Sequence, residues 1–226
     1  MQTIAGLPNG QCDHAGLKIG GYDGTQDQHS PTTTVQQRIT QQEPSLLTGQ
    51  RIFYDAAWTN DENMQACHAG IGIVMQLEDN EHCQQLCIAA ISPPVSSPLE
   101  AEAYGLLLAT TLADTLRIQD PQYYTDCSVL AAAATAKSIF KDTCHWNIRP
   151  VLASIQASPS FVRNKVAHVS RCFNVKAHHQ AKLATKIQNR PVAFRCLFSD
   201  TGHCIVRDVL ATSSVSPFTL LSVKCC

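Results

Sequence analysis

Apolar and polar residues alternate along the chain from about Arg51 onward, and the first part of this pattern predicts three strands. The segments 51–58, 70–78 and 84–91 are short, rich in apolar and β-branched residues, and separated by polar stretches. Short apolar runs bounded by polar turns are typical of neighbouring antiparallel strands. We therefore expect a three-strand antiparallel meander at the start of the ordered region.

Helix-like and strand-like segments alternate after the meander. Residues 99–116 have apolar positions at helical spacing, and Ser97 followed by Pro98 is typical of a helix start. We then expect a strand, two helices, a strand and a last helix, at 121–126, 128–140, 148–156, 164–173 and 175–187. Strands that come first in a group and then alternate with helices indicate an α/β fold with a mixed sheet.

The two ends of the chain differ from this central region. Residues 1–50 are rich in Gln, Thr, Gly and Pro and contain few large apolar residues, so they cannot bury enough surface to offset chain entropy. We expect a disordered leader or linker there and a single folded domain over 51–188. The pattern of residues 189–226 predicts no particular structure.

Composition and charge narrow the class of protein only slightly. The 226 residues carry a formal net charge of -1, which gives no overall sign of a polyanionic partner. Residues 161–195, however, contain eight Lys and Arg residues and no acid. This asymmetry is compatible with a basic face that binds phosphates and equally with an ordinary solvated surface.

The cysteines and the hydropathy pattern bear on location. The count of 11 cysteines is odd and includes no CxxC pair, and the sequence shows no signal-peptide pattern, so we expect reduced thiols in an intracellular protein. No apolar run approaches the ~20 residues that a membrane-spanning helix needs. We therefore expect a protein that is not inserted in a membrane. We also expect it to be monomeric.

Two acidic residues lie where the pattern predicts burial. Asp55 is at the centre of the apolar strand 51–58, and burying an unpaired charge costs several kcal/mol. Glu102 projects from the middle of the apolar stripe of helix 99–116, whereas Glu100 lies on its polar side. Asp55 and Glu102 therefore require a cationic partner.

A third acid, Asp126, lies where a predicted strand ends and a helix begins. Taken alone it is best explained as a helix N-cap. Taken with Asp55 and Glu102, it suggests three carboxylates that converge in an apolar setting and repel one another unless a hard divalent cation lies among them. Mg²⁺ held by carboxylates is the arrangement used in two-metal phosphodiester hydrolysis.

The order of these elements and acids resembles the ribonuclease H family. More narrowly, it is similar to the plant ribonuclease H-like domain found in non-LTR retroelements. The resemblance covers about residues 51–188. The matching segments are YDAAW (54–58), GIGIV (70–74), LEAEAYGLLLA (99–109), TDCSVL (125–130) and VSRCFNVKAHHQA (169–181).

This resemblance implies a five-stranded mixed sheet with helices on both faces, and endonucleolytic cleavage of the RNA strand of RNA/DNA hybrids. It implies two ions, Mg²⁺ or Mn²⁺, held by Asp55, Glu102 and Asp126. Where most active members of the family have a fourth acid in the pattern Asn-x-x-Ala-Asp, this chain has His178. Arg171, Lys176 and Lys182 are expected to contact the nucleic-acid backbone.

Several interpretations of His178 remain open. It could serve as a metal ligand or proton shuttle, as a phosphate contact, or as a simple residue of the helix surface. Two hypotheses for the whole protein follow. One is a metal-dependent ribonuclease H, and the other is a nucleic-acid-binding module that keeps the fold but hydrolyses little. A related nuclease, such as an exonuclease or integrase, is a weaker third.

Overall fold

The computed structural model describes residues 50–58, 67–78, 83–139, 145–187, 193–195, 205–213 and 217–225. The leader expected over residues 1–50 therefore lies outside the described residues, apart from Gln50. The strands are β1 (Arg51–Trp58), β2 (His68–Glu78), β3 (Cys83–Pro94), β4 (Gln122–Thr125), β5 (Val166–His168), β6 (Ala193–Arg195) and β7 (Thr219–Cys225).

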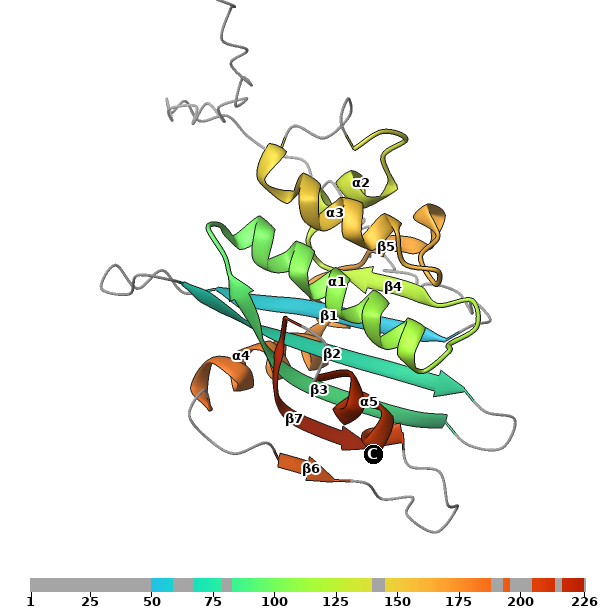
Figure 1. Ribbon diagram of the computed structural model, residues 1–226, viewed down its shortest axis with the longest axis vertical. Coiled ribbons are helices and arrows are strands. Elements are labelled where there is room, and N and C mark those ends of the chain that lie inside the picture. Colours follow the sequence, from blue (N-terminus) through green and yellow to red (C-terminus); the bar gives the residue numbers. More distant parts are fainter. Residues whose placement is uncertain are drawn as a thin grey trace, which may run out of the picture. The chain divides into compact units, whose positions relative to one another are not determined.

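The helices follow in chain order between and after these strands (Figure 1). None of the described helices combines the length and the apolar character needed to cross a bilayer. The α-helices are α1 (Pro98–Thr115), α2 (Ser128–Thr135), α3 (Arg149–Gln156), α4 (Val175–Lys186) and α5 (Ile205–Ser213), and the 3-10 turns are η1 (Trp146–Ile148), η2 (Arg163–Lys165) and η3 (Arg171–Phe173).

The strands form one mixed sheet in the order β5-β4-β1-β2-β3-β7-β6. β1 pairs antiparallel with β2, and β2 with β3, as expected for the meander. β4 lies parallel to β1, and β5 lies parallel to β4. The fold is therefore mixed α/β, and the three strands of the meander pair as the sequence predicts.

The prediction of five strands is wrong, because the sheet has seven strands within the described residues. β7 pairs antiparallel with β3, and β6 pairs parallel with β7, so that the C-terminal region extends the sheet. Leu220 belongs to the main apolar cluster, whereas Leu221 packs with Ala89 and Ala184 in another. β7 is therefore buried on both faces. Its partner β3 lies more than 100 residues earlier, and a local pattern cannot reveal such a pairing.

Two predicted elements are shorter than expected. The strand expected over 164–173 is confined to the three residues of β5. Its neighbour β4 is only four residues long, and three of these, Tyr123, Tyr124 and Thr125, pair with β5. η2 and η3 flank β5 in the chain. The helix expected over 128–140 ends at Thr135, where Ala136 turns to extended backbone.

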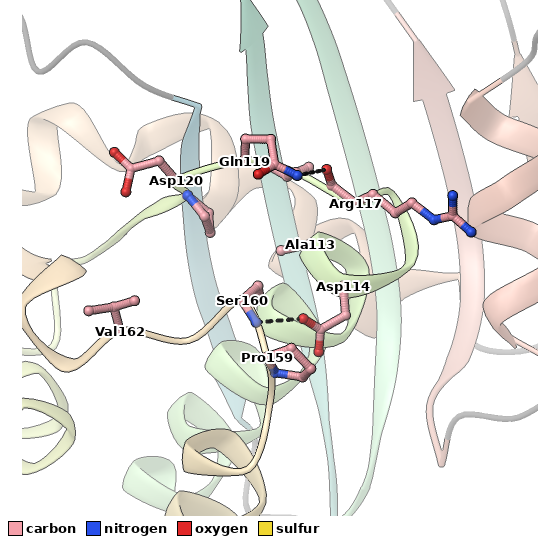
Figure 2. A pocket seen from close by; sticks show the side chains of 10 residues that line it. Ala113, Asp114, Arg117, Gln119, Asp120, Pro159, Ser160 and Val162 are labelled. Carbon is pink, nitrogen blue, oxygen red and sulfur yellow. Dashed lines mark hydrogen bonds between the residues drawn. The ribbon is translucent and has the colours of Figure 1, made fainter.

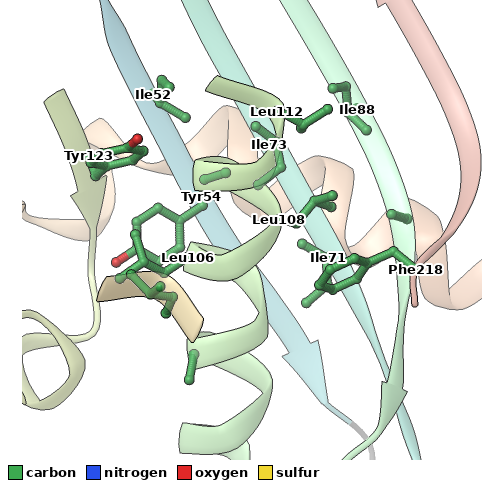
Figure 3. Packing of buried hydrophobic residues seen from close by; sticks show 14 of the residues in the cluster. Ile52, Tyr54, Ile71, Ile73, Ile88, Leu106, Leu108, Leu112, Tyr123 and Phe218 are labelled. Atoms are coloured by element: carbon green, nitrogen blue, oxygen red, sulfur yellow. The ribbon is translucent and has the colours of Figure 1, made fainter. Parts of the chain in front are cut away.

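The face of the sheet beneath α1 is packed with large apolar side chains (Figure 3). Side chains of β1, β2 and β3 meet those of α1, and all of them are essentially excluded from water. Removing this much apolar surface from water is the main source of stability. Prominent members of this cluster are Ile52, Tyr54, Ile71, Ile73, Ile88, Leu106, Leu108 and Leu112.

The opposite face carries α4, and small residues bring its backbone close to β2. A Cβ added at Gly72 would overlap the backbone of Ala177 and Ala181, and one at Gly70 would overlap the carbonyl oxygen of Ala181. Only glycine permits this approach. The GIGIV segment therefore sets the distance between β2 and the helix that carries His178.

Candidate functional site

Asp55, Glu102 and Asp126 converge at one end of the sheet. One carboxylate oxygen from each of the three residues lies within 4.8 Å of the corresponding oxygen of the other two. Asp55 is almost fully buried, and the other two are partly buried. The structure thus brings together the three acids that the sequence singled out, from β1, α1 and the segment that follows β4.

Strand register explains how Asp55 and Asp126 meet. β1 and β4 are parallel neighbours with Phe53 opposite Tyr124, so the residues that follow these two positions lie at the same end of the sheet. The hydroxyl of Thr125 accepts a hydrogen bond from the backbone N–H of Cys127 at 3.0 Å, which shapes the turn that carries Asp126. Asp55 and Asp126 therefore meet because β1 and β4 pair as parallel strands.

Asp126 is not a helix cap. The N-cap of α2 is Cys127, whose side chain makes no capping hydrogen bond. The Asp126 carboxylate instead accepts a hydrogen bond of 3.0 Å from the Asn174 amide. The N-cap interpretation of this aspartate is therefore wrong, and its carboxylate is held beside Asp55 and Glu102.

Helix α1 brings Glu102 to the site through close packing on β1. Gly105 faces the Tyr54 ring, and a Cβ at this position would lie 3.2 Å from the ring edge. Ser97 is the N-cap of α1, as predicted, and its hydroxyl accepts from the backbone N–H of Glu100. Glu100 itself accepts hydrogen bonds from Ser96 on the exposed side. Only Glu102 of the two glutamates therefore enters the site.

The electrostatics of the site are unfavourable for three bare carboxylates. Burial raises the pKa of Asp55 to about 6, the hydrogen bond from His178 opposes this, and the nearby charge of Asp126 adds to it. Burial raises the pKa of Glu102 well above its usual value, and the charges of Asp55 and Asp126 raise it further. A cation among these groups would offset both the burial and the repulsion.

The site also contains an oxygen that requires a partner. Glu102 is hydrogen-bonded to the backbone of Ala56, yet its Oε2 is buried and has no hydrogen-bond partner among the described residues. A buried charged oxygen without a partner is costly. Carboxylate oxygens at this spacing are the hard ligands that Mg²⁺ and Mn²⁺ take, so the residues present fit a divalent ion.

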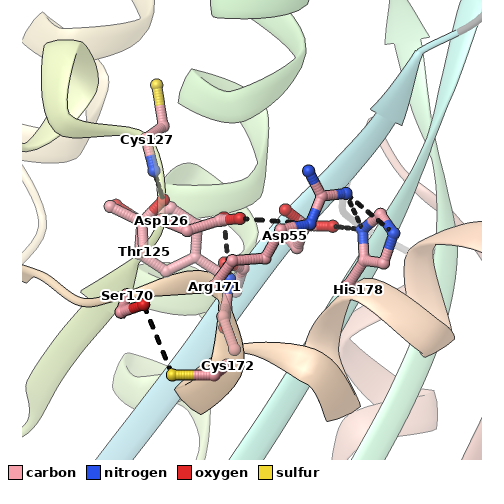
Figure 4. Close-up of polar contacts among 10 residues, drawn as sticks. Asp55, Thr125, Asp126, Cys127, Ser170, Arg171, Cys172 and His178 are labelled. Carbon is pink, nitrogen blue, oxygen red and sulfur yellow. Dashed lines mark hydrogen bonds and ion pairs between the residues drawn. The ribbon is translucent and has the colours of Figure 1, made fainter.

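His178 lies beside Asp55 rather than on the solvated side of its helix. Its Nδ1 is 2.7 Å from Asp55 Oδ2, and its side chain is 20% exposed (Figure 4). The two residues are far apart in the sequence, and α4 brings them together. This contact favours a role within the site over the reading of His178 as a plain surface residue.

Arg171 is the cation nearest to the acids among the described residues. Its Nη2 lies 3.0 Å from His178 Nε2, and its Nε lies 4.0 Å from Asp126 Oδ2 (Figure 4). The other two residues that are predicted to contact nucleic acid, Lys176 and Lys182, lie on α4. Lys176 donates a hydrogen bond to Gln85, and Lys182 is exposed. The structure therefore brings Arg171 to the carboxylates but not Lys176 or Lys182.

Asn174 is a residue of the site whose role the sequence did not reveal. It is the first residue of the pattern that ends at His178 and directly precedes the predicted last helix. It does stand at the N-cap position of α4, but its side chain makes no capping bond. The fully buried amide instead donates to the Tyr54 carbonyl at 2.9 Å and to Asp126 at 3.0 Å. The available signal in the sequence was the position of Asn174 within the segment 169–181 that resembles ribonuclease H.

A separate cavity lies near the C-terminal end of α1 (Figure 2). Its volume is about 340 Å³, and Arg117 and Asp120, which both have positive φ, contribute to its lining. Asp114 in its wall accepts hydrogen bonds from the Ser158 hydroxyl and from the Ser160 backbone N–H. This aspartate fixes the loop that follows α3 and is not among the clustered carboxylates.

Solved structures similar to this chain include the N-terminal ribonuclease H domain of Rv2228c from Mycobacterium tuberculosis, at 19% identity and TM-score 0.46 over 60% of this chain and 94% of that one. Ribonuclease H1 from Halobacterium salinarum NRC-1 is 16% identical, with TM-score 0.44 over 60% and 98%. LC11-RNase H1 in complex with an RNA/DNA hybrid is 15% identical, with TM-score 0.43 over 62% and 99%.

No curated protein is a significant match to this sequence. The family model described as reverse transcriptase-like matches residues 53–184, which is more than half of the chain. This range includes all three clustered acids together with Arg171, Asn174 and His178. The chain belongs to the reverse transcriptase-like family.

Proposed function

We propose that this protein is a metal-dependent endonuclease that hydrolyses the RNA strand of RNA/DNA hybrids, and that its domain derives from a retroelement of the non-LTR type. The observation that carries the proposal is the cluster of Asp55, Glu102 and Asp126, whose carboxylate oxygens lie within 4.8 Å of one another. The sequence resemblance to ribonuclease H supplies the reaction for which this cluster is suited.

The three acids are the residues that would hold Mg²⁺ or Mn²⁺, as one ion or as a pair. Glu102 offers a buried oxygen without a partner, and burial and charge repulsion raise the pKa of both Asp55 and Glu102. A divalent ion, when bound, neutralises developing charge on the phosphate and lowers the pKa of an attacking water. These observations support a metal centre that Asp55, Glu102 and Asp126 would form together.

The remaining residues have supporting roles in this proposal. Asn174 orients the carboxylate of Asp126, and His178 occupies the position of the fourth acid beside Asp55. Arg171, Lys176 and Lys182 supply positive charge for the phosphates of the hybrid. A hybrid duplex is recognised by its shape and its 2′-hydroxyl groups rather than by its sequence.

A second function has one specific observation in its favour. His178 stands where a carboxylate is expected, and Mg²⁺ prefers oxygen ligands over imidazole. A protein with this substitution could bind hybrids while hydrolysing them slowly. The alternative is therefore a nucleic-acid-binding module that keeps the fold of a nuclease.

The test is cleavage of a labelled RNA/DNA hybrid by the full chain in Mg²⁺ and, separately, in Mn²⁺. Glu102→Gln removes one charge from the cluster and is expected to lower the rate by about 100-fold or more. Glu100→Gln is the matched control on the same helix, and it should cleave like the wild type, because Gln keeps an acceptor for Ser96.

Two outcomes would change the assignment. If the hybrid is bound but not cut in either metal, the protein is the binding module. If Glu102→Gln and Glu100→Gln cleave equally well, the carboxylate cluster is not the catalytic centre and the proposal is wrong.

A further inference from the structure

A groove lies beside the candidate site, on the side of the sheet that carries α4. Its volume is about 380 Å³, and most of the residues that line it are apolar. Phe53, Val74 and Gln76 contribute one part of its lining, and η3 together with the first turn of α4 contributes the rest. η3 also carries Arg171, which lies against His178. The groove and the candidate site therefore share one segment of the chain.

The lining of this groove combines aromatic rings with a cation. Phe53 stacks on Tyr124 with ring centroids 4.9 Å apart, and Phe173 also lines the groove. Lys176 is the cation, and its Nζ donates a hydrogen bond to Gln85 at 2.9 Å. None of the described residues that line the groove is acidic. Single-stranded nucleic acids are bound by this combination, because unpaired bases pack on aromatic rings while cations hold the phosphates.

A row of paired residues leads from the groove across the sheet to two more cations. Val74 of β2 pairs with Cys87 of β3, and the row continues to Lys224 of β7 and Arg195 of β6. Side chains of residues paired in this way point to the same face of a sheet. Cys87 packs with Ala177 of α4. Lys224 and Arg195 therefore lie on the α4 face of the sheet as well.

These two cations are neighbours without an acidic partner. Arg195 is exposed and Lys224 is partly exposed, and paired strands lie about 5 Å apart. Within the described part of the chain, neither cation forms an ion pair with a carboxylate. Like charges side by side on neighbouring strands repel each other, and a bound phosphate would offset this repulsion. β6 and β7 lie outside residues 53–184, so these cations are not part of the region that the family model matches.

We propose that the groove and the cations beyond it bind a single-stranded extension of the nucleic-acid substrate. Unpaired bases enter the groove, and phosphates lie at Lys176, Lys224 and Arg195. A duplex hides the faces of its bases, so an apolar groove suits a single strand, and the shared segment η3 places the groove next to the carboxylates. The choice of partner rests on the proposed function, but binding on this surface requires neither a metal nor cleavage.

The test is the affinity of the full chain for labelled RNA/DNA hybrids in EDTA, which prevents metal-dependent cleavage. One hybrid is blunt, and the others carry a single-stranded oligothymidylate extension of about ten nucleotides at one end or the other of the DNA strand. We expect an extension at one of these ends to increase the affinity by about 10-fold over the blunt hybrid.

A double variant tests the cations, and a charge-matched double variant is its control. Arg195→Gln with Lys224→Gln should lose most of the gain, and the slope of log affinity against log salt should fall by about 1.4. Its affinity for the blunt hybrid should not change, which also shows that the fold is intact. Arg117→Gln with Arg207→Gln removes two exposed cations that follow α1 and lie on α5, and it should keep the gain.

A single variant tests the groove. Val175 lines the groove, is exposed, and is the first residue of α4. Val175→Glu places a carboxylate at a helix start, where acids are tolerated, but also where the proposal puts nucleic acid. We expect the ratio of the two affinities, extended hybrid over blunt hybrid, to fall to about one. A ratio that stays at the wild-type value would exclude the groove from the binding surface.

Three further results would overturn the proposal. The first is a wild type for which neither extension adds affinity. The second is equal binding of the extended hybrid by the two double variants. The third is a loss of blunt-hybrid affinity in Arg195→Gln with Lys224→Gln as large as the loss for the extended hybrid, because the surface then contacts the duplex. Failure of the proposed nuclease is separate, since it appears as absent cleavage in Mg²⁺ and Mn²⁺ while the gain from the extension is kept.

Discussion

The two faces of the central sheet are packed in different ways. Beneath α1, large apolar side chains such as Leu108, Leu112 and Ile73 fill the space between helix and sheet. Beneath α4, the glycines of β2 meet the helix backbone directly. The first face gains stability from buried area, whereas the second fixes the distance between two backbones.

This difference matters because the candidate site draws on both faces. Glu102 comes from α1, while Asn174 and His178 come from the start of α4 and contact β1 through hydrogen bonds. A hydrogen bond of 2.7 Å between Asp55 and His178 tolerates little displacement of α4. The closely packed face is therefore the one that positions the site.

The largest effect is expected from adding one methyl group to the α4 face. In Gly72→Ala the new Cβ meets the backbone of Ala177 and Ala181, which cannot move aside as a side chain can. We expect a loss of about 3 kcal/mol in the free energy of unfolding, and reduced cleavage because α4 is displaced. Chemical denaturation and the hybrid cleavage assay measure the two effects.

The matched change on the other face is Gly105→Ala. Here the new methyl lies 3.2 Å from the Tyr54 ring edge, and alanine favours the helix by about 1 kcal/mol, so the net change should be within about 1 kcal/mol. If both variants lose the same stability, the two faces do not differ in the way described.

A smaller effect is expected from removing the amide of Asn174. Asn174→Ala deletes hydrogen bonds to the Tyr54 carbonyl and to Asp126, and leaves the buried carbonyl without this donor. We expect a loss of about 2 kcal/mol in the free energy of unfolding together with slower cleavage. Thermal and denaturant unfolding report the first effect, and the hybrid assay reports the second.

Asn147→Ala is the corresponding control beside the start of α1. Asn147 makes a 3.0 Å hydrogen bond to the Ser97 hydroxyl in a partly buried place, so its loss should cost about 1 kcal/mol or less. Equal losses in the two variants would argue against a special role for Asn174 in holding the site.

The smallest effect concerns the dependence of stability on pH in the metal-free protein. Burial raises the pKa of Asp55 from 3.8 to about 6, so between these values the folded state binds more protons than the unfolded state. The contribution of Asp55 to stability is therefore present below pH of about 4 and is lost as pH rises through about 6. We expect this contribution to fall by about 1 kcal/mol for each pH unit between these two values.

Denaturant unfolding at several pH values checks this sign against two variants. The stability of the wild type relative to Asp55→Asn should increase as the pH is lowered through about 6. Asp120→Asn alters an exposed carboxylate that is paired with Lys165 away from the cluster, and it serves as the control. A wild type that loses stability relative to Asp55→Asn on acidification would contradict the raised pKa.

Much of the fold follows from local pattern, and the exceptions share one cause. The meander, α1 with its Ser97 cap, and the positions of β4 and α4 are readable because periodicity and capping act over a few residues. The additional strands β6 and β7 and the shortness of β5 were missed. Each depends on pairing with a strand that is distant in the sequence.

The candidate site could likewise be predicted only in part. The sequence alone marked Asp55 and Glu102 as acids in apolar surroundings, and the structure places Asp126 with them. The N-cap reading of Asp126 failed because the Asn174 amide, far away in the chain, takes its carboxylate. Arg171, for which the sequence predicts a contact with nucleic acid, also lies against His178, which the sequence did not indicate.

The sequence by itself determined which residues carry charge into the interior, because burial of an acid in an apolar stripe is visible from periodicity alone. Only the tertiary structure decided which partners those acids have. Hydrogen bonds between β1, the turn after β4 and the start of α4 join residues up to 123 positions apart, and their geometry depends on the approach that Gly70 and Gly72 allow between β2 and α4.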